Sequence, residues 1–180
     1  MTLTVLASGH LIDTPDRPVP RFPQRAAGDV ARLVGQALDD WHVGPGSVLV
    51  CGGARGADLI AAEAALARGA AVTLCLAMPV AEFEASSVAL PDTDWSDRFH
   101  RVMQHSDVRV LADAGVGDDR FSQVNQWMAD LVKSLDDRPC VLLVWDGGTG
   151  DGPGGTADMV TRLGYDVTDP HVRIIDPTTL

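Results

Sequence analysis

The stretch Ser47–Pro79, SVLVCGGARGADLIAAEAALARGAAVTLCLAMP, decides the fold. It begins with a short apolar run that predicts a buried strand, and the glycine-rich turn 52–56 follows this strand directly. The alanine-rich segment 57–68 predicts a helix that ends at Gly69, and the apolar run 72–76 predicts a second strand. A strand, a turn, a helix and a parallel strand in this order form a βαβ unit.

The turn Gly52-Gly53-Ala54-Arg55-Gly56 joins a strand to the start of a helix. Backbone N–H groups are exposed at a helix N-terminus, where the helix dipole favours an anion. We therefore expect Gly52, Gly53 and Gly56 to let the backbone approach a phosphate, and Arg55 to bind it through two hydrogen bonds. The alternative is a tight turn without a ligand, in which Arg55 faces solvent or forms a salt bridge.

The rest of the chain alternates in the same way between strand-like and helix-like segments. Strands are expected at 2–7, 108–111, 141–145 and 172–175, and helices at 24–41, 80–87, 95–105, 121–135 and 156–163. This alternation predicts an α/β fold, a Rossmann-like three-layer sandwich with a mostly parallel sheet, in one domain over residues 1–180.

The amino-acid composition limits the kinds of molecule that this protein is expected to bind. The formal net charge of −11 opposes the binding of duplex nucleic acid. Neither a membrane-length apolar run nor a signal-peptide start occurs, so we expect a cytoplasmic protein without a membrane partner. Cys51, Cys75 and Cys140 each lie in or beside a strand-like run, which indicates buried thiols of a reducing compartment. No metal-ligand spacing is present, so no metal site is predicted.

Two further loops with small residues follow expected strands. Ser8-Gly9-His10 follows the first strand, and the glycine-rich loop 146–155 follows the strand 141–145. Ligands of parallel sheets bind beyond the carboxyl ends of the strands, near the point where the strand order reverses. We therefore expect Ser8, Gly9 and His10 to meet the turn 52–56 in one crevice, although a lone histidine is more often structural.

The motif Pro153-Gly154-Gly155-Thr156 leads into the helix 156–163. We expect Gly154, Gly155 and Thr156 to contact a phosphate, and Thr156 can alternatively cap the helix.

Two acids are weak catalytic candidates. Asp158 lies in the first turn of its helix and either contacts a ribose, acts as a catalytic carboxylate or only stabilises the helix start. Glu63 shares a helix face with Leu59 and Leu66, so we expect it to be paired or peripheral more than catalytic.

The segment 11–23 contains four prolines, which forbid a long helix. A long irregular loop in a compact domain is usually functional. Asp13, Arg17, Arg21 and Phe22 are therefore candidates for a lid or for a wall that stacks on a base.

These motifs resemble a known superfamily. Residues 51–58, CGGARGAD, resemble the GGARGID segment of the Smf/DprA family, and residues 153–156 resemble the PGGxGT motif of the LOG family. Both families belong to the SLOG superfamily of Rossmann-like nucleotide binders. The segments 8–13, 17–23 and 145–147 look closer still to uncharacterised SLOG-type domains of bacterial signalling proteins.

The resemblance implies a nucleotide-derived ligand and a sensor role in a bacterial signalling or defence pathway, and no particular cofactor is identified. It also implies self-association, for which the helices around Val30 and Val124 are candidate faces. LOG enzymes carry an Arg-Lys pair before the PGG strand and a Glu after the Gly-Thr, and this chain has neither. Binding without hydrolysis is therefore the leading hypothesis. A LOG-like nucleoside 5'-monophosphate phosphoribohydrolase, another N-glycosidase and a molybdopterin-type cofactor carrier are the alternatives.

Overall fold

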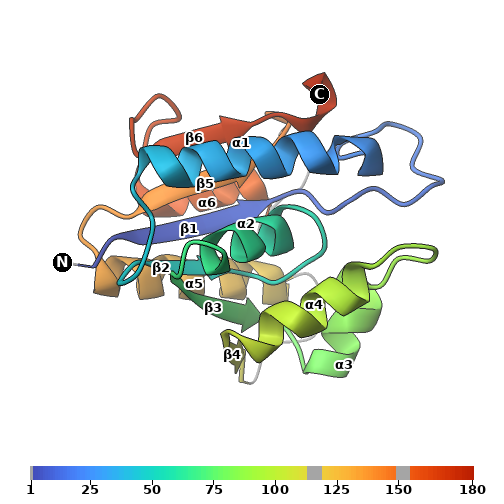
Figure 1. Cartoon of the computed structure of the whole chain (residues 1–180), viewed down its shortest axis with the longest axis horizontal. Helices are drawn as coiled ribbons and strands as arrows, with labels where there is room; N and C mark the ends of the chain where they lie inside the picture. The colour runs from blue at the N-terminus through green and yellow to red at the C-terminus, as the bar shows by residue number, and fades with distance from the viewer. Residues whose placement is uncertain (1, 113–118, 149–154) are drawn as a thin grey trace.

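The computed structural model describes residues 2–112, 119–148 and 155–180, and it contains strands and helices in alternation (Figure 1). The strands are β1 Thr4–Gly9, β2 Val48–Cys51, β3 Ala71–Leu76, β4 Asp107–Val110, β5 Cys140–Val144 and β6 Val172–Ile175. The α-helices are α1 Ala27–Asp40, α2 Ala57–Leu66, α3 Val80–Phe83, α4 Trp95–Gln104, α5 Asp119–Leu135 and α6 Thr156–Leu163. The predicted Rossmann-like α/β fold is confirmed.

The six strands form one sheet in the order β4-β3-β2-β1-β5-β6. Every neighbouring pair is parallel, so the sheet is entirely parallel where the sequence predicted a mostly parallel one. Leu6 of β1 pairs with Val50 of β2 on one side and with Val141 of β5 on the other. The order reverses between β1 and β5, which is where parallel sheets place their ligands.

Alternate residues of each strand face the two helical layers, because successive side chains of a strand point to opposite faces. Val5 of β1 belongs to the core beneath α1, α2 and α4, whereas Leu6 belongs to the core beneath α5 and α6. Figure 1 shows α1 and α2 in front of the sheet, with α5 and α6 behind it. Val30 and Val124 are buried in these two cores, so their side chains are not available at an oligomer face.

Some boundaries differ from the sequence prediction. The helix expected from residue 24 begins as a 3-10 turn, Gln24–Ala26, before α1. The helix expected at 80–87 divides into α3 and a π-helical turn, Glu84–Val88. Asp94 is the N-cap residue of α4, and its side chain makes no capping hydrogen bond. The three cysteines are buried free thiols, as predicted.

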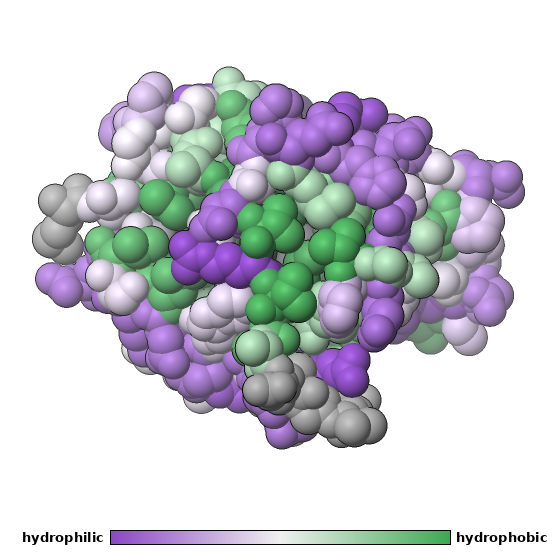
Figure 2. All heavy atoms as spheres, turned by 90° about the horizontal axis from the view of Figure 1, so that it is seen from below, coloured by the Kyte–Doolittle hydropathy of each residue, from purple (hydrophilic) through white to green (hydrophobic). Residues whose placement is uncertain are grey.

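The β4 side of the sheet is an edge, because β4 pairs only with β3 among the described strands. Val110 is one of the exposed large apolar residues of the chain. Figure 2 looks at the lower face of Figure 1, where β4 and α3 lie, and it shows apolar side chains grouped near the middle of this face. None of the helices in the described part of the chain is long and apolar enough to cross a bilayer.

Candidate functional site

Two adjoining hollows open at the carboxyl ends of the central strands. One has a volume of about 420 Å³ and the other about 460 Å³. Ser8, Gly9, Leu11 and Phe121 line both of them, so the hollows share a wall at the end of β1. This is the reversal point between β1 and β5, and both hollows therefore lie where the strand order places a ligand site.

We call the first the polar hollow and the second the apolar hollow. Besides the shared residues, the polar hollow is lined by His10, Ile12, Asp13, Thr14, Arg17, Arg21, Arg55, Gly155 and Thr156. Besides the shared residues, the apolar hollow is lined by Gly52, Ala54, Asp58, Cys75, Ala77, Met78, Phe83, Ser86, Ser87, Val124, Asn125 and Met128.

The loop that leaves β1 is closed at its base by Asp13. The N–H of Asp13 donates to the carbonyl of Phe22 at 2.8 Å, and Asp13 Oδ2 accepts from the N–H groups of Arg21 and Phe22, both at 2.9 Å. Phe22 is fully buried in the core and is therefore not available to stack on a base. Its burial anchors the loop, and the loop presents Arg17 and Arg21 to the polar hollow.

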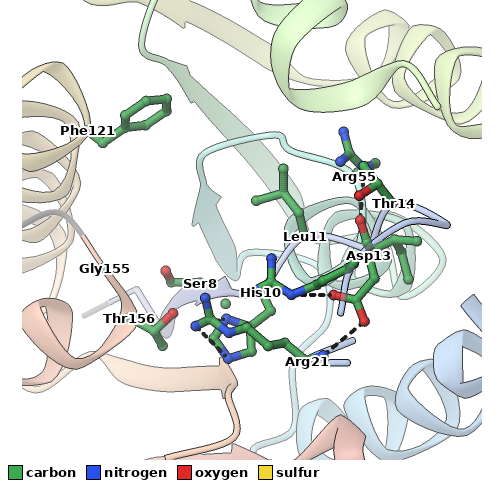
Figure 3. Close-up of a pocket in the computed structure, with 13 residues that line it drawn as sticks. Ser8, His10, Leu11, Asp13, Thr14, Arg21, Arg55, Phe121, Gly155 and Thr156 are labelled. Carbon is green, nitrogen blue, oxygen red and sulfur yellow. Dashed lines mark hydrogen bonds and ion pairs between the residues drawn. The ribbon is translucent and has the colours of Figure 1, made fainter. Parts of the chain in front are cut away.

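His10 connects this loop to the end of β5. Its Nε2 lies 2.9 Å from Asp146 Oδ1. The Arg21 guanidinium lies 3.0 Å from His10 Nδ1 (Figure 3). Partial burial raises the pKa of Asp146, but hydrogen bonds from His10 and Gly148 and the charge of Arg21 outweigh it and hold this pKa below its usual value. Asp146 is therefore an ionised carboxylate that orients both the imidazole and the guanidinium.

The polar hollow carries a positive charge excess. Arg17, Arg21 and Arg55 line it, against the carboxylate of Asp13 in the lining and that of Asp146, whose Oδ2 lies 3.6 Å from Arg21 Nε. Arg55 is largely buried, and its Nε donates to the carbonyl of Ile12 at 3.0 Å. Arg17 Nε lies 3.4 Å from Asp13 Oδ1. In a chain with a formal net charge of −11, three guanidinium groups around one hollow favour an anionic ligand.

The glycine turn itself is packed against the protein. Three N–H groups at the turn have partners within the chain: Ala54 donates to Asp58 Oδ2, Arg55 to the carbonyl of Ser87 and Ala57 to the carbonyl of His10. A Cβ at Gly56 would lie 2.8 Å from both the His10 carbonyl oxygen and the Ile12 nitrogen. Gly56 is therefore required for close packing against the β1 loop, and these N–H groups are already engaged.

Asp58 occupies the position that an anion at this turn would take. It lies in the first turn of α2 and is only 9% exposed. Burial raises its pKa to about 7, while hydrogen bonds from the backbone of Ala54 and Gly52 act in the opposite direction. Asp58 thus places an ionisable group in the otherwise uncharged lining of the apolar hollow.

The start of α6 opens onto the polar hollow. Gly155 is the N-cap residue, and no side chain caps the helix, so Thr156 does not have the capping role that was its alternative. Gly155 and Thr156 line the hollow, whereas Gly154 lies outside the described residues. Asp158 Oδ2 is 2.7 Å from Arg162 Nε, and Asp158 lines neither hollow.

Glu63 lies on the outer part of α2 and is bound by Arg98 of α4. Its two carboxylate oxygens accept from Arg98 Nε at 2.9 Å and Nη2 at 2.6 Å, and the guanidinium stacks 3.9 Å from the Trp95 ring centroid. Glu63 lines neither hollow. The salt bridge joins two helices, in agreement with the expectation that Glu63 is paired.

The predicted ligand residues separate into three groups. Ser8, Gly9, His10, Arg55, Gly155 and Thr156 line the polar hollow; Gly52 lines the apolar hollow; Gly53 and Gly56 line neither. Sequence reasoning missed Asp146 and Phe121 as site residues. Asp146 lies two residues beyond the end of β5, but only the pairing of β1 with β5 brings it to His10.

Within the described ranges, no three His, Cys, Asp or Glu side chains are grouped in a way that would hold a metal ion.

No protein-family model matches the sequence, and no curated protein matches it. Five solved chains are similar in fold, and two of them are described here. DNA processing protein A (DprA) from Streptococcus pneumoniae is 13% identical with a TM-score of 0.43, over 99% of this chain and 59% of DprA. The Moco carrier protein from Chlamydomonas reinhardtii is 15% identical with a TM-score of 0.39, over 99% of this chain and 92% of that protein. The chain thus spans about three fifths of DprA, and the similarity is one of general fold.

Proposed function

We propose that this chain binds a nucleotide-derived small molecule across the two hollows, with its phosphate in the polar hollow and its base in the apolar hollow. The observation that carries the proposal is the junction at Ser8 and Gly9 of a cation-lined hollow with an apolar one. A nucleotide has the same two parts, an anion and a flat apolar ring system.

The polar hollow offers the chemistry that holds a phosphate. Guanidinium groups match phosphate oxygens with paired N–H donors, and Arg17, Arg21 and Arg55 supply three of them. The N-terminus of α6 opens into the same hollow at Gly155 and Thr156, where the helix dipole also favours negative charge. The ionised Asp146 holds His10 and Arg21 in place without lining the hollow.

The apolar hollow offers surfaces for a base. Phe83, Phe121, Met78 and Met128 line it, and aromatic and thioether side chains make favourable contacts with flat rings. Its polar groups are few, which is typical of pockets that orient a ligand with a small number of hydrogen bonds.

Hydrolysis of the ligand has no support from the two acids that were candidates for it. Glu63 and Asp158 are each paired with an arginine, and neither lines a hollow. A carboxylate held in this way is not positioned beside an anomeric carbon. The geometry therefore favours binding, and hence a sensor or carrier of a nucleotide, over N-glycosidic cleavage.

Isothermal titration of the protein with AMP, cyclic AMP, NAD and ADP-ribose tests the proposal. We expect saturable binding of at least one of them, weakened at least 30-fold by Arg21→Ala because a charge-assisted hydrogen bond contributes about 2 kcal/mol. Arg109→Ala, on the exposed edge strand β4, is the matched control and should not alter affinity. Binding of none of these compounds, or equal binding by Arg21→Ala, would disprove the proposal. Chromatography of the same mixtures should show no free base.

A further inference from the structure

The apolar hollow contains a carboxyl group that no cation neutralises. Among the described residues, Asp58 has no salt-bridge partner, and its Oδ2 accepts a hydrogen bond from the N–H of Ala54 at 3.1 Å. The same oxygen lies nearest to Gly52, because a Cβ built there would be 3.0 Å from Oδ2 and no closer than 4.0 Å to any other Asp58 atom. Oδ2 is therefore the oxygen that the turn holds.

The second oxygen of Asp58, Oδ1, is directed to a different environment. It has no hydrogen-bond partner among the described residues. Among the described residues, every fully buried side-chain nitrogen or oxygen atom has a hydrogen-bond partner. Oδ1 is therefore not sealed in the core, and since Asp58 lines the apolar hollow, Oδ1 reaches the surface of that hollow.

The surroundings of Asp58 favour its neutral form. The other titratable groups around it are the thiols of Cys51 and Cys75, and burial raises the pKa of both, that of Cys75 to about 12. The polar neighbours from the other elements, Ser87 and Asn125, are uncharged. Arg55 lines the polar hollow instead. A protonated carboxyl in this position presents an O–H donor to the hollow, because Oδ2 is already engaged as an acceptor.

We propose that Asp58 recognises the base of the bound nucleotide by donating a hydrogen bond from Oδ1 to the ring nitrogen N1, so that the hollow selects an adenine-type base. This inference rests on the proposed function, since it requires a nucleotide with its base in the apolar hollow. The N1 of adenine is unprotonated and accepts a hydrogen bond, whereas the N1 of hypoxanthine carries a proton and repels a donor. A base that displaces the remaining water from the hollow also disfavours the carboxylate, so binding takes up a proton.

Titration with ADP-ribose at pH 6 and pH 8 tests the inference, because its disubstituted diphosphate does not ionise in this range, unlike a terminal phosphate with a pKa near 6. We expect about tenfold weaker binding at pH 8, since burial raises the pKa of Asp58 to about 7 and only the protonated form binds well. The counterpart with hypoxanthine in place of adenine should bind more weakly than ADP-ribose at pH 6.

Asp58→Asn separates this effect from other titrations. The amide keeps an acceptor for Ala54 and an N–H donor for the hollow, and it does not ionise. Histidine side chains also change charge in this pH range. The decisive quantity is therefore the difference between the wild type and Asp58→Asn in how strongly ADP-ribose affinity depends on pH. We expect this variant to bind ADP-ribose equally at pH 6 and pH 8, whereas Asp97→Asn, on the exposed face of α4, should behave as the wild type.

The outcomes distinguish the two proposals. In the first outcome, Arg21→Ala weakens ADP-ribose binding, but the pH dependence of this binding is the same in the wild type and in Asp58→Asn. This result overturns the role of Asp58 and leaves nucleotide binding in place. Loss of binding at both pH values in a folded Asp58→Asn variant, or equal affinity for the hypoxanthine counterpart, also overturns it. Binding of no nucleotide at either pH overturns both proposals.

Discussion

The glycine turn 52–56 and the loop that leaves β1 lie side by side, and they contribute to the site in opposite ways. The turn is the more regular motif in the sequence, yet two of its N–H groups and that of the adjoining Ala57 donate to Asp58, Ser87 and His10 inside the protein. The β1 loop has no regular pattern, yet its side chains line the polar hollow. Glycines permit close backbone packing as readily as close approach to a ligand, and only the contacts tell the two uses apart.

The largest expected effect concerns Asp58, which fills the turn. Its pKa is raised by burial from 3.8 to about 7, so the folded state binds a proton that the unfolded state releases at lower pH. Relative to Asp58→Asn, the wild type should lose stability as the pH rises from about 4 to about 7, by at most about 4 kcal/mol, and remain level above that range. Urea unfolding of both proteins at pH 4, 6 and 8 measures this difference. A difference that is constant with pH would show that Asp58 is ionised in the fold.

The next largest effect separates packing from ligand contact at Gly56. Gly56→Ala places a Cβ 2.8 Å from two backbone atoms of the β1 loop, at a φ of +95° that L-residues rarely adopt. We expect a loss of about 3 kcal/mol in the free energy of unfolding, without any ligand present. Gly28→Ala in the first turn of α1 is the control: its Cβ meets no atom within 4 Å, so it should not destabilise the fold. A stable Gly56→Ala variant that only fails to bind ligand would reverse our assignment.

The turn's contribution to the polar hollow should come from the Arg55 side chain. Arg55→Gln removes one of the three guanidinium groups there, and we expect nucleotide affinity to fall about 10- to 100-fold, or 1.5 to 3 kcal/mol. Arg101→Gln on α4 removes an exposed arginine from the same chain and should leave affinity unchanged. Calorimetry at constant ionic strength gives both values, and equal affinities would place the phosphate elsewhere.

The smallest effects are expected at the two acids that lie away from both hollows. Glu63→Gln and Asp158→Asn each weaken a partly exposed salt bridge, which should cost about 1 kcal/mol or less in stability. Ligand affinity should stay within about twofold of the wild type. A large loss of affinity in either variant, measured by the same titration, would return that acid to the candidate catalytic residues.

Local sequence determined the strands and helices, because their signals act over a few residues. The apolar runs at 48–51 and 141–144 are too short and too apolar for an exposed helix, and they form strands. The residues from Thr156 to Leu163 form the predicted helix, which ends before Gly164. The same signals located Ser8, His10, Arg55 and Thr156 near one edge of the sheet, since parallel strands end together.

Only the tertiary structure decided which of these groups line a hollow and which are buried or hydrogen-bonded within the protein. The pairing of β1 with β5 joins residues 136 positions apart, and it brings Asp146 to His10. The burial of Phe22, the engagement of the turn's N–H groups and the position of Asp58 in the apolar hollow depend on neighbours that are distant in the chain. Hydrogen-bond partners and desolvation are set by such long-range contacts, so a linear pattern does not encode them.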